Sequence, residues 1–361
     1  MPSGQTLLLS PAELAYLQTS LSLPTPIRPD GRKPTQFRPL TAETGILPGT
    51  NGSARVCFSD GTEAIVGVKA EIEQTVEQAT ADLRIVSGSG EENGSKNAEP
   101  AARNAWLEIT VEIPGYRDDD PTTVFLASML SEALTADGEF AKKLVINRRF
   151  HWKLYLDIFL ISPPLSYPLP LLSLTTHLAL LATRLPRLKS EGDEDPMFND
   201  DWEASTYLYP RDRTLPGPRP PITLLVVSVG DNIFFDPSGE ELAVAEVALA
   251  ISVAESPAGE EKKGAMEVDS RRPLRLLAMR SVDPPSRLTP PGIPNVDNPT
   301  TGTSGAPAKK GPLKGDAPKG VWKAPVGGAK FSMIQLMVQQ VLEAGGVADN
   351  VLDGIDSVDL A

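Results

Sequence analysis

The sequence predicts a mixed fold of the α+β class, because two different apolar periods alternate along one chain. Apolar and polar residues alternate over Glu63–Glu73, Trp106–Ile113 and Phe150–Ile161, which is the period of half-buried strands. Between and after these segments, Pro121–Leu134 has the spacing of an amphipathic helix. Pro168–Leu185 is apolar all round, which is typical of a helix buried against a sheet. No fixed repeat accompanies these patterns.

The first 52 residues predict a short helix followed by an extended arm. Ser10-Pro11-Ala12-Glu13 is a capping box with proline at the first helical position, so the helix is expected over about 11–21. Prolines then interrupt residues 24–39, which favours an extended chain. We expect Arg28 and Arg32 in this arm to fix it against its own domain or against a neighbouring subunit.

The main domain is predicted over residues 53–283, with insertions at about 87–103, 190–220 and 255–272 that lack an apolar period. After the apolar helix, further strands are expected at Ile222–Val229, Ile233–Phe235, Val247–Val253 and Arg275–Val282.

The end of the chain divides into two parts. Residues 284–330 are rich in Pro, Gly and Lys and have no apolar period, so we predict a disordered insertion there. Residues 331–361 are predicted to form a C-terminal helix over Phe331–Ala344, stopped by Gly345-Gly346, and a tail.

Composition excludes several classes of site. The 361 residues include 47 acidic and 34 basic side chains, one cysteine and two histidines. A single cysteine, Cys57, excludes an internal disulfide framework and cysteine-based metal clusters, and His151 and His177 offer little for histidine-rich ones. The sequence has no membrane-spanning apolar run and no basic region before its first apolar stretch, so we expect an intracellular, soluble protein. The net charge of −13 means that any contact with RNA must be local.

Several segments together resemble the RNase PH family, and within it the ring subunits of the eukaryotic RNA exosome. The resemblance covers roughly residues 7–282 and the last helix. Its residues include Ile27-Arg28-Pro29-Asp30-Gly31-Arg32, Glu43-Thr44-Gly45, Asn51–Val56, Ile65–Glu71, Gly115–Asp119 and Asp236-Pro237.

The resemblance implies a fold and a setting. The fold is the RNase PH-like domain, similar to the second domain of ribosomal protein S5, here as a single domain with disordered insertions. The setting is a hexameric ring of RNase PH-like subunits in paired heterodimers, with RNA-binding cap subunits and catalytic exosome ribonucleases as further partners. The implied function is 3′-to-5′ RNA processing and degradation, including rRNA maturation. The implied locations are the nucleus, the nucleolus and the cytoplasm.

Catalysis is not expected of this chain. Active members of the family hold phosphate with a Gly-Thr-Arg turn after the long strand, where the resemblance places Ser162–Pro168. This stretch has no glycine and no arginine, and Pro163, Pro164 and Pro168 have no N–H to donate. We therefore predict a non-catalytic scaffold that lines the RNA channel, with no catalytic residue, cofactor or metal ligand.

Two alternatives stay open from the sequence. One is a phosphorolytic 3′-to-5′ exoribonuclease, in which Asp157 and Asp236 would matter. The other is a different RNase PH-like paralogue of the ring. Asp236 lies near the position of acidic metal-binding residues in active members, although an aspartate before a proline commonly caps a turn.

The predicted RNA-binding residues are Arg117, Lys142 and Lys143. Arg117 lies just before a helix, where the resemblance implies an arginine that faces the channel. Its alternative role is an ion pair with Asp118–Asp120 or with a neighbouring subunit. Lys142 and Lys143 belong to a basic cluster with Arg148 and Arg149, which could instead be a solvated or subunit-facing surface.

Overall fold

The computed structural model describes residues 9–75, 104–117, 119–210, 219–256, 273–288 and 321–360. The predicted insertion at 87–103, most of that at 255–272 and the middle of the segment 284–330 lie outside these ranges, as does Asp118. Among the described helices, none is long and apolar enough to cross a membrane.

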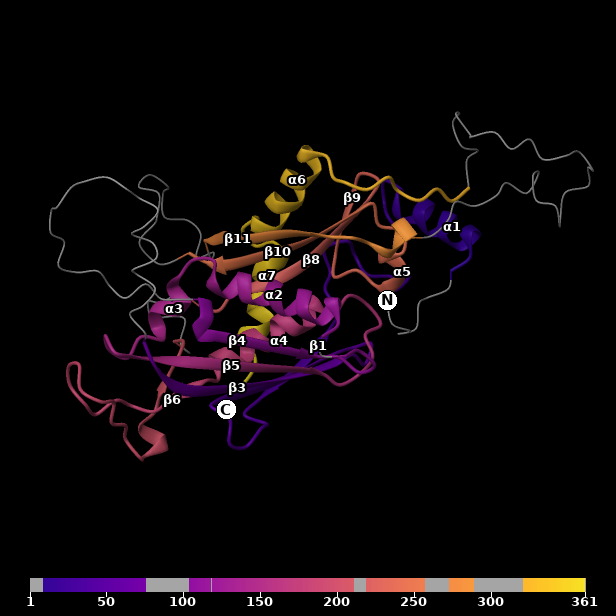
Figure 1. Cartoon of the computed structure of the whole chain (residues 1–361). Coiled ribbons are helices and arrows are strands. Elements are labelled where there is room, and N and C mark those ends of the chain that lie inside the picture. Colours follow the sequence, from indigo (N-terminus) through magenta and orange to yellow (C-terminus); the bar gives the residue numbers. More distant parts are fainter. Residues whose placement is uncertain are drawn as a thin grey trace, which may run out of the picture.

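Two β-sheets form the framework of the fold (Figure 1). The strands of the larger sheet lie in the order β1 (Leu40–Thr44), β2 (Gly52–Phe58), β3 (Glu63–Gln74), β5 (Phe150–Leu160) and β4 (Leu107–Glu112). Those of the smaller sheet lie in the order β11 (Leu274–Val282), β10 (Val247–Glu255), β8 (Ile222–Val229) and β9 (Asn232–Phe235). Strands β4 and β5 are parallel, and the other paired strands of both sheets are antiparallel.

Helices α2 (Pro121–Thr135) and α4 (Leu169–Leu181) lie between the two sheets (Figure 1). Each residue of α4 is buried, which explains why its sequence is apolar on all sides. The helix contacts β2, β3 and β5 on one side and β8 on the other. Gly52 permits this packing, because a Cβ atom there would lie 2.6 Å from the Cα of Thr183 and 2.8 Å from the carbonyl oxygen of Ala179.

Shorter helices complete the core. Helices α1 (Pro11–Leu21) and α5 (Gly239–Leu242) pack on the other face of the smaller sheet, where Leu14 and Leu21 join Leu225, Val227 and Phe234 in a second apolar cluster. The capping box predicted for α1 is present, with Glu13 N–H donating to Ser10 Oγ at 3.3 Å. The remaining helices are α3 (Glu139–Lys143), α6 (Phe331–Leu342) and α7 (Val347–Asp356), the last of which lies within the predicted tail.

The apolar helix is shorter than its sequence predicts. It ends at Leu181, and Arg184–Leu185 instead forms a short strand, β6, that pairs with β7 (Thr206–Tyr207). Tertiary pairing accounts for the difference, since the Arg184 N–H donates to the carbonyl oxygen of Asn51 at 2.8 Å and the Leu208 N–H donates to that of Thr183 at 3.0 Å. Part of the predicted insertion at 190–220 therefore belongs to a β-paired hairpin, which Phe198 anchors by a ring contact with Trp152 at 5.0 Å.

The segment 284–330 also has ordered ends. A turn of 3₁₀ helix covers Pro285–Leu288, where the Ser286 side chain is fully buried and donates to the carbonyl oxygen of Ala245. At the other end Trp322 is 1% exposed and packs in the second apolar cluster. The prediction of disorder is thus wrong for these two ends, because one tryptophan in a Lys- and Pro-rich stretch has no apolar period to reveal it.

His177, on α4, makes the stability of the fold sensitive to acid. Burial and the nearby Arg219 lower its pKa to about 4, although Asp356 acts in the opposite direction. As the pH falls below the ordinary value of 6.5, the unfolded chain binds the proton first, so the folded state loses stability between about pH 6.5 and pH 4. We expect a loss of about 3 kcal/mol over this window. Urea unfolding of the parent and of His177→Leu checks this, because the variant should show a shallower pH dependence; equal slopes would contradict it.

Candidate functional site

The turn Ser162–Pro168, where active relatives of the resembled family hold phosphate, connects β5 to α4. The Ser162 hydroxyl accepts a hydrogen bond from the backbone N–H of Glu63 at 2.9 Å. Helix α4 begins directly after Pro168 and has Pro170 in its first turn, so two of its leading residues have no N–H to present to an anion. Between this turn and Arg38 lies a cavity of only about 10 Å³. That is about the space of one water molecule, and a phosphate ion does not fit.

Arg38 is the cation that lines this cavity, and its guanidinium is bound by two aspartates. Its Nε lies 2.8 Å from Asp236 Oδ2 and its Nη2 lies 2.6 Å from Asp236 Oδ1, while Nη1 lies 2.5 Å from Asp60 Oδ2. Its guanidinium also lies over the Phe58 ring, 4.6 Å from the centroid. Burial alone would lower the pKa of Arg38, but the hydrogen bonds and charge of Asp236, with Asp60, raise it. This side chain is therefore a permanent cation with its charge already matched.

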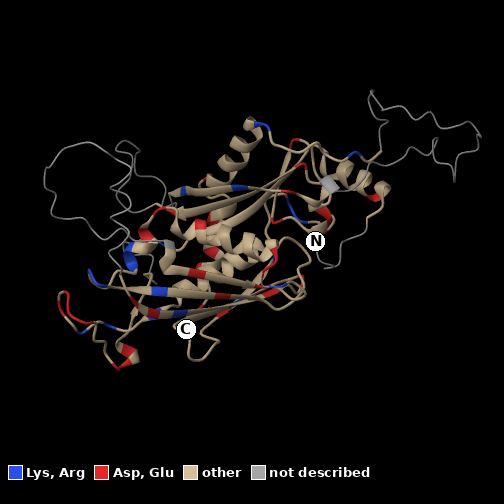
Figure 2. Cartoon of the chain, in the orientation of Figure 1, with Lys and Arg blue, Asp and Glu red and all other residues tan. Residues whose placement is uncertain are grey.

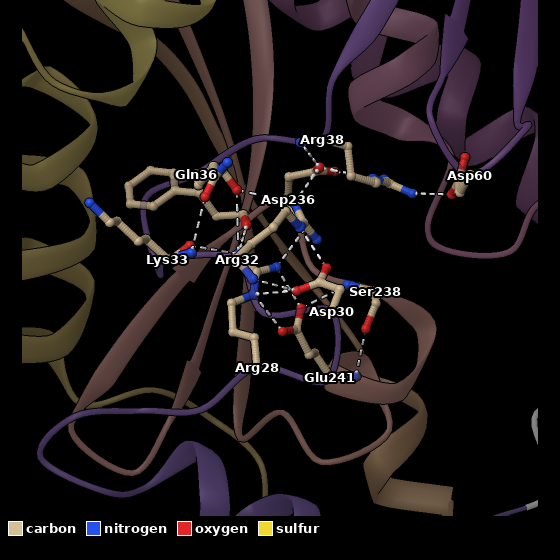
Figure 3. A network of polar contacts seen from close by, with 11 residues as sticks. Arg28, Asp30, Arg32, Lys33, Gln36, Arg38, Asp60, Asp236, Ser238 and Glu241 are labelled. Atoms are coloured by element: carbon tan, nitrogen blue, oxygen red, sulfur yellow. Dashed lines mark hydrogen bonds and ion pairs between the residues drawn. The ribbon is translucent and has the colours of Figure 1, made fainter.

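Two more arginines from the arm join the same cluster (Figure 3). Arg28 is buried and makes a bidentate pair with Glu241, at 2.6 and 2.7 Å, and it also donates to the backbone carbonyl of Asp236 at 3.0 Å. Arg32 donates to Asp236 Oδ2 at 3.0 Å and to Asp30 Oδ2 at 2.5 Å. The prediction that Arg28 and Arg32 fix the arm is confirmed, and the partner is their own domain.

Asp236 is the centre of this arrangement, which we call the arm latch: Arg28, Arg32 and Arg38 with Asp30, Asp60, Asp236 and Glu241. The Asp236 side chain is fully buried, and its backbone has φ = 48°. Both carboxylate oxygens face arginines of the arm, so the side chain binds the arm and does not cap the turn that follows it. Three guanidinium groups meet four carboxylates here, which leaves no excess positive charge for a phosphate.

The other acidic candidate, Asp157, lies on the exposed face of the larger sheet. Its carboxylate accepts a hydrogen bond from Thr110 Oγ1 on the neighbouring strand β4 at 3.2 Å. Asp120 caps α2 by accepting from the Thr122 N–H at 2.8 Å. Within the described part of the chain, no group of three or more His, Cys, Asp and Glu side chains is arranged to hold a metal ion.

The three predicted RNA-binding residues do not lie together. Arg117 follows the C-terminal end of β4, whereas Lys142 and Lys143 lie on α3, at the opposite end of the sheet where β5 begins. The Arg117 side chain is 85% exposed, and its guanidinium pairs with Asp119 at 3.0 Å. Of the two described aspartates among the alternative partners, Asp119 and Asp120, the first is thus the one in contact.

The two lysines have local partners. Lys142 Nζ lies 2.8 Å from Glu139. Lys143 is half-buried, with Nζ 4.6 Å from the centre of the Tyr209 ring and 3.4 Å from the carbonyl oxygen of Leu208, and burial lowers its pKa.

The basic turn before β5 also faces acidic residues. Arg149 pairs with Asp195 at 3.1 Å, and the Arg148 N–H donates to Asp193 at 3.3 Å. Both acidic residues lie at the tip of the hairpin that follows β6. In Figure 2 acidic and basic residues are interspersed along the described chain, in agreement with these local pairs.

A second cavity lies beside Arg117, and sequence reasoning missed two of its residues. It has a volume of about 300 Å³ and is lined by residues 111–117 at the end of β4 and by Phe159 and Leu160 of β5. Tyr116 follows a turn in which its N–H donates to the Ile113 carbonyl at 3.1 Å and Gly115 has φ = 85°. Proline followed by glycine is the signal for such a turn and was available in the sequence; the proximity of Phe159 was not.

Comparison with known proteins defines the class to which this fold and site belong. Residues 36–186 match the RNase PH family, described as the 3′ exoribonuclease family, domain 1. The exosome complex component RRP42 of Saccharomyces cerevisiae is 33% identical over 250 residues, which are 68% of this chain and 81% of that protein. The exosome complex component rrp42 of Schizosaccharomyces pombe is 32% identical, over 69% of this chain and 80% of that protein. In Sulfurisphaera tokodaii, the exosome complex component Rrp42 is 24% identical, over 63% of this chain and 74% of that protein.

The chain therefore belongs to the 3′ exoribonuclease family of RNase PH-like proteins. Within that family it is an Rrp42-like member. The resemblance seen in the sequence and the expected fold are both confirmed.

Proposed function

We propose that this chain is a ring subunit of the RNA exosome that supports 3′-to-5′ RNA processing without a phosphorolytic site of its own. Its similarity to exosome components of two yeasts supports the assembly. The turn Ser162–Pro168 after β5 supports the lack of phosphorolytic activity. The cavity that it borders has room for at most one water molecule, and the arginine beside this cavity, Arg38, is already bound by Asp236 and Asp60. This last observation carries the proposal.

The proposed partners are other RNase PH-like subunits, RNA-binding cap subunits and the catalytic ribonucleases of the complex. Within the described sheets, β1 and β4 are the edge strands of the larger one and β9 and β11 those of the smaller one. Unpaired strand edges and adjoining faces are surfaces on which another subunit can pack. Nuclear, nucleolar and cytoplasmic locations remain part of the same proposal.

Arg117 is the residue that we propose for RNA contact in the ring channel. Its pair with Asp119 is exposed on both sides, and such pairs are worth roughly 0–1 kcal/mol, so a phosphodiester can replace the aspartate. Lys142 and Lys143 lie at the other end of the sheet and would need a separate stretch of RNA.

Two measurements test the proposal. Native mass spectrometry of the tagged chain, purified gently from its own cells, should find it in a stoichiometric complex with other RNase PH-like subunits. The purified chain, incubated with RNA and inorganic phosphate, should release no nucleoside diphosphates. A lone monomer or a homo-oligomer would contradict the ring assignment. Phosphate-dependent release that disappears in Asp157→Asn would instead support the alternative of a phosphorolytic exoribonuclease.

A further inference from the structure

We propose that the cavity at the end of β4 is a binding site for a single base of single-stranded RNA, held by stacking on Phe159 and Tyr116. This inference rests on the proposed function, because it assigns a role to a surface that RNA would meet in the exosome. The cavity volume of about 300 Å³ lies at the lower end of the range for small-molecule sites, roughly 300–1,000 Å³. That space suits one base rather than a folded RNA element.

The walls of the cavity come from two neighbouring strands and one turn. Glu112 and Phe159 are direct partners in the parallel register of β4 and β5, so their side chains project from the same face of the sheet. The turn through Pro114 and Gly115 then returns the chain so that Tyr116 also borders the cavity. Two aromatic side chains from distant parts of the sequence thereby border the same opening.

Phe159 has the exposure that a stacking platform needs. It is 41% exposed, although it lies on a central strand whose alternate residues, Leu156, Ile158 and Leu160, are buried in the core. A phenylalanine ring beside an open cavity presents apolar surface that a base can cover. Stacking on an aromatic ring is independent of sequence, because each of the four bases has a π-face.

Charge decides which part of the RNA enters. Glu112 contributes a carboxylate to the wall and Arg117 a guanidinium, so a phosphate group is repelled on the Glu112 side and can pair only with Arg117. An uncharged base is not repelled by Glu112. The carboxylate can also accept a hydrogen bond from the exocyclic amino group of cytosine, adenine or guanine. Uracil has no such group. It offers its ring N3–H to the carboxylate instead, so we expect any of the four bases, and not the backbone, to occupy the cavity.

The test uses the chain assembled in its ring and a short single-stranded RNA that carries 2-aminopurine, whose fluorescence is quenched on stacking. Phe159→Ala should weaken RNA binding about tenfold and remove the quenching, whereas Phe159→Trp should retain both. Phe331→Ala is the matched control, because Phe331 is an exposed aromatic residue on α6, away from the cavity. Glu112→Gln should weaken RNA binding less than Phe159→Ala does, because the amide oxygen still accepts a hydrogen bond from the base.

Two outcomes separate this inference from the proposed function. If Phe159→Ala assembles normally in the ring and binds RNA with unchanged affinity and quenching, the base site is refuted while the ring assignment stands. If the parent chain does not enter a ring, the failure lies with the proposed function, and RNA binding by the isolated chain then decides whether the cavity binds a base at all.

Discussion

Replacing Asp236 by asparagine is expected to lower the free energy of unfolding by about 3–5 kcal/mol, the usual effect of removing one partner from a buried ion pair. Asp236 is fully buried and binds Arg38 through both carboxylate oxygens and Arg32 through one. Asparagine keeps the shape and tolerates the positive φ at this position, so the loss reports the charge and the one acceptor oxygen that the amide NH2 replaces. The two arginines would then lack a buried counter-charge.

Denaturant unfolding of the purified chain measures this effect. Asp195→Asn is the matched control, since its pair with Arg149 is exposed on both sides and should contribute no more than about 1 kcal/mol. A second variant, Asp236→Asn combined with Arg38→Met, should regain part of the stability because it removes a cation whose remaining carboxylate partner is the partly exposed Asp60. An Asp236→Asn chain that is as stable as the parent would show that the arm latch does not hold the fold together.

Replacing Trp322 by alanine is expected to destabilise the fold by about 3–5 kcal/mol, as is usual when a large core side chain is truncated. Trp322 is 1% exposed and packs in the cluster of α1 and the smaller sheet, so the substitution leaves a large cavity. The loss would show that this residue connects the coil before α6 to the core.

Trp202→Ala serves as its control, because Trp202 is 46% exposed and its loss should change the free energy of unfolding by no more than about 0.5 kcal/mol. Hydrogen exchange adds a second readout: Trp322→Ala should speed exchange in α1, which packs in the same cluster, and leave β3 in the larger sheet comparatively protected. Equal stability of the two tryptophan variants would mean that Trp322 is not part of the core.

The elements with a clear apolar period were predictable. The strands at Glu63–Gln74 and Phe150–Leu160 and the helix at Pro121–Thr135 lie within about a residue of their expected ends, because alternation and helical spacing are local properties of the chain. The end of α4 at Leu181 is not predictable, because the hydrogen-bond partners of Thr183 and Arg184 lie far away along the chain. Helix α7 is not predicted, because the two glycines before it indicate the end of a helix.

The candidate sites, like the fold, could be predicted only in part from the sequence. The loss of the phosphate turn could be predicted from Ser162–Pro168, because prolines lack an N–H in any fold. The ion pair between Arg38 and Asp236 could not be predicted, since the two residues lie 198 positions apart along the chain. The meeting of Tyr116 and Phe159 around one cavity likewise depends on the pairing of β4 with β5.

Family membership, the expected fold and the missing phosphate donors therefore follow from residue types and their spacing, which act within a few positions along the chain. The role of Asp236, the burial of Trp322 and the separation of Arg117 from the lysines of α3 depend on which distant segments the two sheets bring together. Burial and ion pairing are long-range in sequence but short-range in space, so only the folded structure decides them.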